Sequence, residues 1–236
     1  MNYLPRHAAT ILQQSLDVSP VVAVMGARQT GKSTLVRNEA ALANHLYLTL
    51  DDLDVAERAR LAPEDLVRSA PRLILDEVQR APHLIHAIKR VVDETSPRQP
   101  GQFVLTGSAN LLLMQRVSET LAGRATYLTV WPLTRSERLG LGGTGIWDDL
   151  FDQPVAQWLD LFLSSDLGTE RQRSGDGSPN GSVWREQARI GGYPVPALEL
   201  ADDAQRTIWF DGYVRTYLER DLQDLAAIDN LVDFRR

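Results

Sequence analysis

The chain has 236 residues, 43% hydrophobic and 24% charged, a balance typical of a soluble globular protein with one or two domains. It has no cysteine, which excludes disulfides, thiolate metal sites and cysteine nucleophiles. The formal net charge of −6 argues against a surface built to hold nucleic acid, because such surfaces are usually basic.

The N-terminal region shows no targeting signal. Its first sixteen residues lack the apolar core of a signal peptide, and no apolar run anywhere approaches the roughly 18 residues of a membrane span. We therefore expect no membrane segment and a cytoplasmic location. The same stretch predicts a short amphipathic helix with Ile11, Leu12 and Leu16 on one side.

Strands and helices are expected to alternate over the first 130 residues. Short, mainly apolar runs predict strands at residues 21–25, 46–50, 72–77, 102–108 and 125–130. Helices are expected between them at residues 31–43, 55–70 (broken near Pro63), 83–95 and 109–123. This order predicts an α/β three-layer sandwich, in which helices cover both faces of a five-stranded parallel sheet.

The alternation ends near Pro132, and the rest of the chain is expected to be mainly helical. A glycine-rich linker at 139–145 is followed by a predicted helix at 147–163 and a polar surface loop at 164–182. A second helical region begins near residue 183. Two glycines and two prolines at 191–196 are expected to interrupt it.

The segment GARQTGKST after the first predicted strand fits the P-loop pattern G-x-x-x-x-G-K-[ST]. Its place between a strand and a helix is the context that distinguishes a P-loop from a chance match. The residues expected to bind the nucleotide are Gly26, Ala27, Arg28, Gln29, Thr30, Gly31, Lys32, Ser33 and Thr34. Lys32 is expected to reach the β- and γ-phosphates and the Ser33 hydroxyl to bind Mg²⁺.

The third predicted strand ends in two acidic residues, Asp76 and Glu77. Asp76 lies 44 residues after Lys32 and suits the magnesium shell through coordinated waters, so Ser33 and Asp76 are the predicted metal residues. Glu77 is the candidate that polarises an attacking water. The adjacent glutamate, together with the absence of a guanine-reading N-K-x-D stretch, favours ATP over GTP.

The fourth predicted strand also ends in polar residues. If it lies between the strand before the P-loop and the strand of Asp76, its end points at the γ-phosphate. Thr106 or Ser108 would then hold the attacking water, with Ser108 preferred. The alternative is a helix cap of the Ser/Asn type.

Three arginines are candidates to stabilise charge at the γ-phosphate. They are Arg28 in the P-loop, Arg116, and Arg124 just after Gly123, with Arg124 preferred. Near the C-terminus, Trp209, Tyr213 and Tyr217 recur every four residues. That spacing favours a core-facing stripe over a base-stacking platform.

A family resemblance joins these motifs. GARQTGKSTL, LTLDD, LILDEVQRAP, VLTGSANLLL, LAGR and WPLTRSE, in that order over about 18–138, resemble an uncharacterised group of prokaryotic AAA-superfamily ATPases. GGYPVP and residues 209–228 resemble the domain of unknown function that usually follows this core. Proline often stands in the family where this chain has Ala27, and glutamate where it has Val195; neither change affects the chemistry. Members usually continue well beyond residue 236, so the chain is expected to be shorter than typical.

The resemblance implies an AAA-type core with the P-loop strand central in its sheet. It implies Lys32, Ser33, Asp76 and Glu77 in the roles given above, with Thr106 or Ser108 as a polar sensor. The expected domains are an ATPase domain (1–138), a linker and loop with a helix (139–182) and a helical C-terminal region (183–236).

The leading prediction is an ATPase, in which Mg²⁺-dependent attack of water on ATP is coupled to a conformational change after residue 139. The first alternative is a nucleotide-dependent switch whose hydrolysis is slow or needs a partner's arginine. The second is a kinase for a small acceptor, with residues 169–178 as its lid. Because AAA relatives often assemble, a homo-oligomer and an unidentified protein partner are expected besides ATP.

Overall fold

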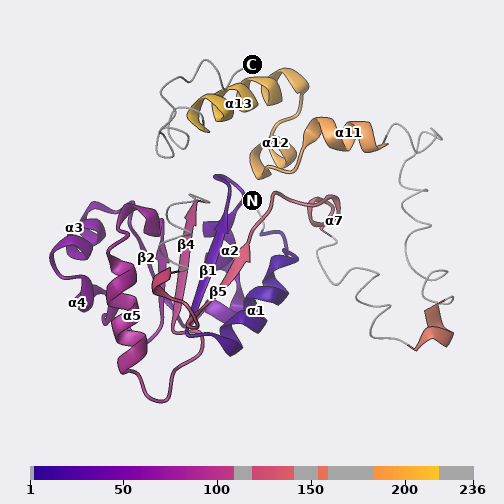
Figure 1. Cartoon of the computed structure of the whole chain (residues 1–236). Helices are drawn as coiled ribbons and strands as arrows, with labels where there is room; N and C mark the ends of the chain where they lie inside the picture. Colours follow the sequence, from indigo (N-terminus) through magenta and orange to yellow (C-terminus); the bar gives the residue numbers. More distant parts are fainter. Residues whose placement is uncertain (1–2, 109–118, 141–153, 159–182, 218–236) are drawn as a thin grey trace.

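The computed structural model of the chain describes residues 3–108, 119–140, 154–158 and 183–217 (Figure 1). Its centre is a five-stranded sheet with the order β2-β3-β4-β1-β5, in which every neighbouring pair is parallel. The strands are β1 (Val21–Gly26), β2 (Leu46–Thr49), β3 (Leu73–Asp76), β4 (Phe103–Ser108) and β5 (Ala125–Thr129). All five lie where the sequence predicts them, and the predicted fold class is confirmed.

The order of the strands decides which residues can meet. β1, which precedes the P-loop, is an interior strand between β4 and β5, while β4 occupies the middle of the sheet. β4 therefore lies between β1 and β3, which is the condition stated above for Thr106 and Ser108. In the β1–β4 register, Gly26 lies opposite Ser108. All strands end at one edge because the sheet is parallel, and we call it the carboxyl edge.

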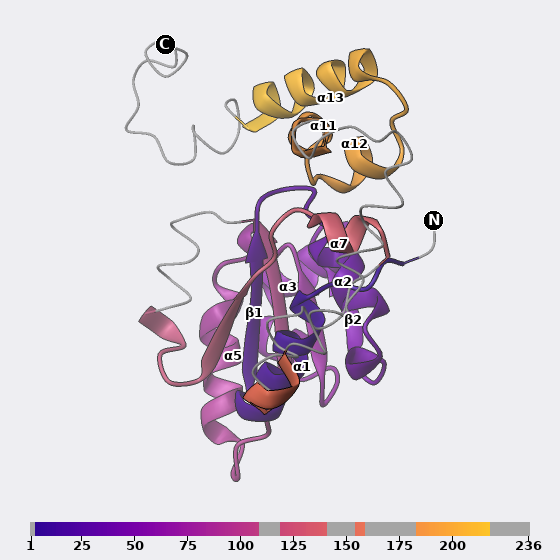
Figure 2. The ribbon, with the colours of Figure 1, turned by 90° about the vertical axis from the view of Figure 1, so that its right-hand side faces the viewer.

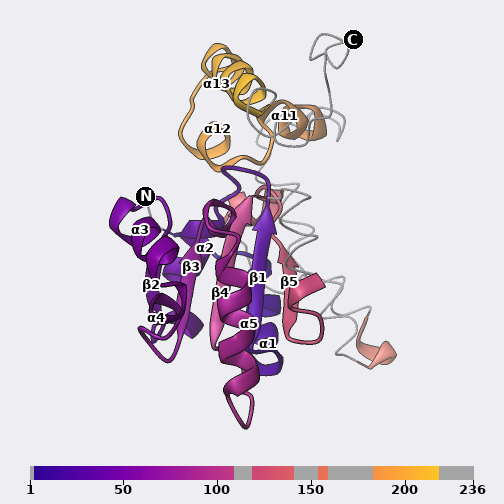
Figure 3. The same cartoon turned by 60° about the vertical axis from the view of Figure 1, so that its left-hand side comes forward.

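Helices cover both faces of the sheet (Figure 3). They are α1 (Ala8–Val18), α2 (Lys32–Asn38), α3 (Leu53–Leu61), α4 (Pro63–Val67) and α5 (Leu84–Glu94). Successive residues of a strand point to opposite faces. Accordingly, Val21, Ala23 and Met25 pack with α3, α4 and α5, whereas Val22 and Val24 pack with α1 and α2. Fully burying such a side chain contributes roughly 1.5–3 kcal/mol, so the two-sided core stabilises the sheet whose strands end at the carboxyl edge.

Two local predictions need correction. The helix expected over 31–43 ends at Asn38, because Glu39 is extended (φ −70°, ψ 126°) and a separate 3-10 turn, η1 (Ala40–Leu42), follows it. In α1, Leu12 and Leu16 are buried as expected, but Ile11 is 52% exposed. The break before Pro63 occurs as predicted, with Ala62 between α3 and α4. Another 3-10 turn, η2 (Val78–Arg80), follows β3.

Beyond β5 the described chain is helical. It contains α7 (Arg135–Arg138), the turn η3 (Val155–Gln157), α11 (Val183–Ile190), α12 (Pro194–Leu198) and α13 (Asp203–Thr216). We call residues 183–217 the C-terminal cap, because this part lies over the carboxyl edge of the sheet (Figures 1 and 2). The helices predicted at 109–123 and 147–163 fall mostly outside the described residues.

The expectation that 191–196 excludes a helix is wrong in part, since α12 begins inside it at Pro194. The first residues of a helix have no intrahelical acceptor for their N–H groups, so proline is tolerated there. Pro194 and Pro196 both lie in that first turn. Within the described ranges, no helix combines the length and apolarity that a bilayer crossing requires.

Candidate functional site

The P-loop connects the end of β1 to the start of α2. Gly26 (φ 154°) and Gly31 (φ 92°) bracket it, and Gln29 between them is left-handed with φ 60°. A Cβ at Gly26 would lie 2.3 Å from the carbonyl oxygen of Val130. No side chain fits there, because the chain after β5 passes directly beside the loop. The first glycine of the motif is therefore fixed by packing as well as by backbone conformation.

Lys32 is folded into the loop. Its side chain is buried, and its ammonium donates hydrogen bonds to the carbonyl oxygens of Gly26 (3.1 Å) and Ala27 (2.7 Å). A buried ammonium is stable only when its protons are satisfied. The loop backbone provides that here and holds the cation on the concave side of the P-loop.

Asp76, at the end of β3, accepts hydrogen bonds from two of the candidate site residues. It is only 4% exposed, and three hydroxyls from three different elements donate to it. The Ser33 hydroxyl donates to Oδ1 at 3.1 Å, Thr106 also donates to Oδ1, and Tyr47 donates to Oδ2. These donors satisfy the oxygens of a buried carboxylate, which would otherwise be costly to remove from water. The sequence predicts that Ser33 and Asp76 belong to one metal site, but it gives no signal for Tyr47.

Tyr47 keeps its proton in this position. Burial, together with the hydrogen bond to Asp76, raises the pKa of Tyr47 to about 12. The phenol is therefore a donor over the whole physiological pH range.

The donor set fits magnesium. The Ser33 hydroxyl and the Asp76 carboxylate are hard oxygen groups of the kind Mg²⁺ takes, and they lie 3.1 Å apart. Within the residues that the structure describes, no group of three His, Cys, Asp or Glu side chains forms a complete metal cage. Mg²⁺ is usually held by one or two protein groups plus phosphates and water, so two protein oxygens suffice for it.

Glu77 follows Asp76 in a strained conformation. Its φ of 59° and ψ of 42° are left-handed, which costs a non-glycine residue roughly 1–3 kcal/mol. Its side chain accepts a hydrogen bond from Gln79, a residue that sequence reasoning missed, and its N–H donates to the Thr106 hydroxyl at 3.4 Å. The kink turns the chain away from β3 immediately after Asp76. Such strain is typical of functional sites.

Thr106 and Ser108 both reach the site on β4. Both are buried, and the Thr106 hydroxyl is engaged with Asp76, whereas Ser108 lies in register with Gly26 at the start of the P-loop. The structure therefore brings together Lys32, Ser33, Asp76, Glu77, Thr106 and Ser108 at the ends of three adjacent strands.

The candidate arginines within the described residues do not gather at the carboxyl edge of the sheet as a group. Arg28 lies on the P-loop, and Arg116 falls outside the described residues. The preference for Arg124 within one chain needs correction. Its guanidinium contacts both carboxylate oxygens of Asp93 (2.6 and 2.9 Å), and its carbonyl accepts from the N–H of Val21, the first residue of β1.

Arg124 therefore lies at the amino edge of the sheet, and this hydrogen-bonded pairing lowers the pKa of Asp93 below its ordinary value. The six residues of β1 separate this edge from the P-loop, a span of about 17 Å at about 3.3 Å per residue. That is farther than an arginine side chain extends.

Arg6, a second residue that sequence reasoning missed, braces the P-loop from outside. It is buried and donates to the carbonyl oxygens of Thr30 (3.0 Å) and Trp131 (2.7 Å) and to the carboxylate of Glu137 (3.1 Å). It joins the N-terminal segment, the P-loop and α7 at one point.

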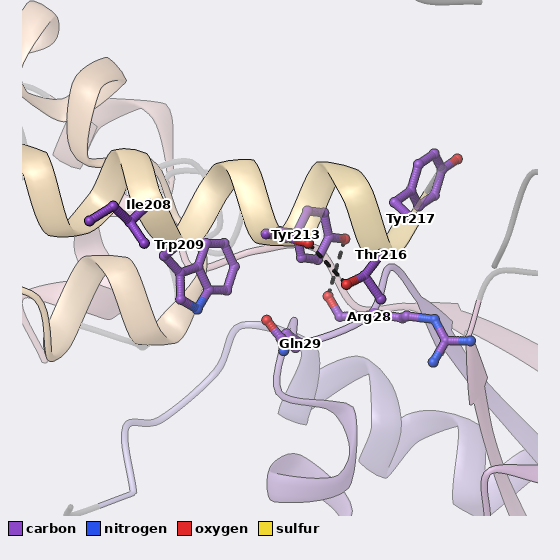
Figure 4. Close-up of a pocket in the computed structure, with 8 residues that line it drawn as sticks. Arg28, Gln29, Ile208, Trp209, Tyr213, Thr216 and Tyr217 are labelled. Atoms are coloured by element: carbon purple, nitrogen blue, oxygen red, sulfur yellow. Dashed lines mark hydrogen bonds between the residues drawn. The ribbon is translucent and has the colours of Figure 1, made fainter. Parts of the chain in front are cut away.

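Two cavities adjoin the P-loop, and Gln29 borders both. One, of about 340 Å³, lies between the loop and the cap. Figure 4 shows Trp209 and Tyr213 on the face of α13 that looks toward Arg28 and Gln29. The other, of about 400 Å³, is lined by Tyr3, Leu4, Arg6, Gln29, Gly31, Thr34, Asn38, Leu133, Pro194, Val195, Leu198 and Glu199.

The prediction of a core-facing aromatic stripe on α13 is wrong. This helix buries no residue, and Tyr217 is 42% exposed. Trp209 and Tyr213 stack with their ring centres 5.3 Å apart, and the Tyr213 hydroxyl donates to the carbonyl of Arg28 at 3.4 Å. The stripe faces the P-loop instead of a core, which the spacing alone does not reveal.

Comparisons with known proteins agree with this geometry. A family model described as an AAA domain matches residues 18–139, and one described as a domain of unknown function matches residues 182–236. Two uncharacterized proteins, Mb2031c of Mycobacterium bovis and Rv2008c of Mycobacterium tuberculosis, are each 30% identical over 224 residues, which is 94% of this chain. The chain spans 40% of the length of these curated relatives.

One solved structure resembles the whole described fold. The Walker-type ATPase PABY2304 of Pyrococcus abyssi aligns with a TM-score of 0.51 at 14% identity, over 92% of this chain and 78% of its own. At this identity the likeness supports the fold alone.

Proposed function

The chain belongs to the AAA domain family, and from that premise we propose that it binds ATP with Mg²⁺ and hydrolyses it to ADP and phosphate. The observation that carries the proposal is the cluster around Asp76. The Ser33 hydroxyl and the Thr106 hydroxyl meet one carboxylate oxygen of Asp76, beside the P-loop that holds the Lys32 ammonium.

Each residue has a proposed role. Lys32 binds the β- and γ-phosphates, and Ser33 with Asp76 holds Mg²⁺, which, when bound, neutralises charge on the phosphates. Glu77 takes a proton from a water molecule. The oxygen of that water forms a bond to the γ-phosphorus, while the bond between the γ-phosphorus and the bridging oxygen of the β-phosphate breaks. Ser108 orients that water, since the Thr106 hydroxyl is occupied by Asp76. The protein contributes mainly positioning and electrostatics.

We place the adenine in the larger cavity. Gly31 and Thr34 border it, at the α2 end of the P-loop and away from Asp76. Apolar groups of Leu4, Leu133 and Pro194 suit a planar ring, and Asn38 offers an amide for its edge. Its volume of about 400 Å³ lies within the range of small-molecule sites.

The first test is release of free phosphate from ATP and Mg²⁺. Wild-type protein is expected to release phosphate, and Lys32→Ala to weaken ATP binding roughly 10–100-fold, because a charged group with several hydrogen bonds is lost. Lys89→Ala, at the only other lysine, is the matched control and should behave as wild type. Repeating the assay over a range of protein concentrations shows whether a second copy completes the site.

The alternatives predict other outcomes. Tight ATP binding without phosphate release, abolished by Lys32→Ala, would favour a nucleotide-dependent switch. Phosphate appearing on a small acceptor, with none free in solution, would favour a kinase and contradict the proposal.

We further propose that the domains divide as 1–138, 139–182 and 183–236, and that ATP occupancy is coupled to the position of the C-terminal cap. Three contacts support the coupling. Arg138 donates to Gln187 (2.6 Å), the N–H of Leu133 donates to the carbonyl of Gly192 (2.6 Å), and Tyr213 reaches Arg28. The cap therefore touches the P-loop directly as well as the segment after β5.

Gly192→Ala is expected to loosen the cap. An added Cβ would lie 2.4 Å from the Leu133 oxygen and 3.1 Å from the Pro132 Cβ, so the chain must shift. Because α12 lines the adenine cavity, we expect ATP to bind about fivefold more weakly, which corresponds to about 1 kcal/mol. Hydrogen exchange of peptides from 183–217 should accelerate.

Gly212→Ala on α13 is the control, since nothing lies within 4 Å of its added Cβ. Equal exchange rates in the wild type and Gly192→Ala, with and without ATP, would contradict the coupling.

A further inference from the structure

The two oxygens of Asp76 have different partners. Oδ1 accepts from Ser33 and Thr106, and Oδ2 accepts from Tyr47. The carboxylate is thus held on both sides. Oδ1 is the oxygen on the side of Ser33, where the proposed magnesium shell lies.

Tyr47 is itself held from α2. The Arg37 guanidinium lies 4.1 Å from the centre of its ring and donates to its hydroxyl at 2.8 Å. A phenol has a single proton. With Arg37 donating to the oxygen, that proton is directed to Asp76, and the cation over the ring face adds a favourable electrostatic contact.

The contacts of Tyr47 connect β2 with α2, two elements that the pairing of the strands does not join. Tyr47 belongs to β2, an edge strand that pairs only with β3, and it lies in register with Ile74. Arg37 belongs to α2, the helix that begins with Lys32 and Ser33. One chain of contacts, Arg37 to Tyr47 to Asp76, therefore links the helix of the P-loop to the carboxylate from the side opposite Ser33.

We infer that Tyr47 is a positioning residue, which occupies Oδ2 of Asp76 so that Oδ1 alone faces Ser33 and the magnesium shell. Without the phenol, Oδ2 loses that donor and the carboxylate is held through Oδ1 alone, by Ser33 and Thr106, so its orientation is less firmly fixed. Preorganised ligands bind more tightly because the ordering has been done before the ion arrives. The inference rests on the proposed binding of Mg²⁺ and ATP.

Tyr47→Phe tests this, because it removes the hydroxyl and keeps the ring beneath Arg37. Binding of a fluorescent ATP analogue (mant-ATP) is followed while MgCl₂ is titrated. We expect the midpoint Mg²⁺ concentration to rise about 10-fold, which corresponds to about 1.4 kcal/mol. Affinity for the analogue in EDTA should be unchanged. Tyr127→Phe on the other edge strand, β5, is the matched control and should titrate as wild type.

Arg37→Met gives an independent variant. It leaves the phenol in place but removes the cation that directs it, so the midpoint should move in the same direction by a smaller factor, about threefold. A shift in both variants, largest for Tyr47→Phe, supports the inference.

Two results would overturn the inference alone, and a third would overturn it together with the proposed function. An unchanged Mg²⁺ midpoint in Tyr47→Phe means that the phenol does not position Asp76. Equal weakening with Mg²⁺ and in EDTA means that Tyr47 supports the fold of the site in general. A wild-type chain that does not bind mant-ATP at any Mg²⁺ concentration contradicts the proposed function itself, and the inference falls with it.

Discussion

Glu77→Gln is expected to lower phosphate release by about 10²–10⁴-fold, the range lost when a general base is removed. The amide can still accept the hydrogen bond that Gln79 donates to Glu77, so the kinked backbone should keep its form. Only the ability to take a proton from water is lost. The proposed function assigns the binding of ATP and Mg²⁺ to Lys32, Ser33 and Asp76, so that binding should remain in the variant.

Single-turnover phosphate release, measured beside mant-ATP affinity, separates the two steps. Glu57→Gln on α3 is the matched control, since that side chain is 55% exposed and forms its ion pair with Arg60 on the same helix. A Glu77→Gln variant with full turnover would exclude this residue as the general base of the proposed mechanism.

Arg6→Met is expected to lower the free energy of unfolding by about 3–5 kcal/mol, the usual cost of removing one partner of a buried ion pair. The side chains of Arg6 and Glu137 are only 6% and 3% exposed. The variant leaves the carboxylate of Glu137 buried without its cation, and the carbonyls of Thr30 and Trp131 lose their donor. Urea unfolding, with Arg60→Met as an exposed control, measures the loss.

The effect should depend on pH. Burial by itself raises the pKa of Glu137, but hydrogen bonds from the N–H groups of Thr134 and His7, together with Arg6, lower it overall below 4.5. A carboxyl whose pKa is depressed on folding stabilises the protein above its unfolded pKa and loses that contribution as the pH falls through the folded value. The difference in the free energy of unfolding between the wild type and Arg6→Met should therefore become smaller below about pH 4.5. A difference in the free energy of unfolding that stays constant from pH 7 to pH 3.5 would contradict this account.

Local sequence patterns predict the five strands of the sheet and supply the P-loop and Asp76 as candidates for the site. The glycines and Lys32 of the P-loop lie within a few residues of one another, and Asp76 is recognised separately as an acidic residue at the end of a short apolar run. Tyr47 is different, because its role depends on β2 lying beside β3, and no local pattern encodes that neighbour. The same holds for Arg6, two of whose partners, Trp131 and Glu137, lie more than a hundred residues away.

Two errors have clear physical causes. Arg124 precedes a strand of a parallel sheet, whereas the P-loop follows one, so a stricter use of strand direction places them at opposite edges. The aromatic spacing on α13 identifies a face of the helix but not the surface that the face covers. Only the arrangement of the cap over the P-loop settles that question (Figure 4).

If Arg124 served the P-loop of a second copy, its position at the amino edge would limit the symmetry by which two copies could share a site. A two-fold axis parallel to the strands places the two amino edges side by side and the two carboxyl edges side by side. The Arg124 of each copy is then separated from the Lys32 of the other copy by the length of a strand. An antiparallel pair brings opposite edges together twice, and an isologous contact of this kind serves both sites. A head-to-tail contact is heterologous, so it leaves one terminal site unserved unless the copies close into a ring. In a closed dimer every site would be complete, so turnover per chain would be constant once the dimer has formed. In an open head-to-tail assembly, turnover per chain would rise with the length of the assembly, because one terminal site stays incomplete.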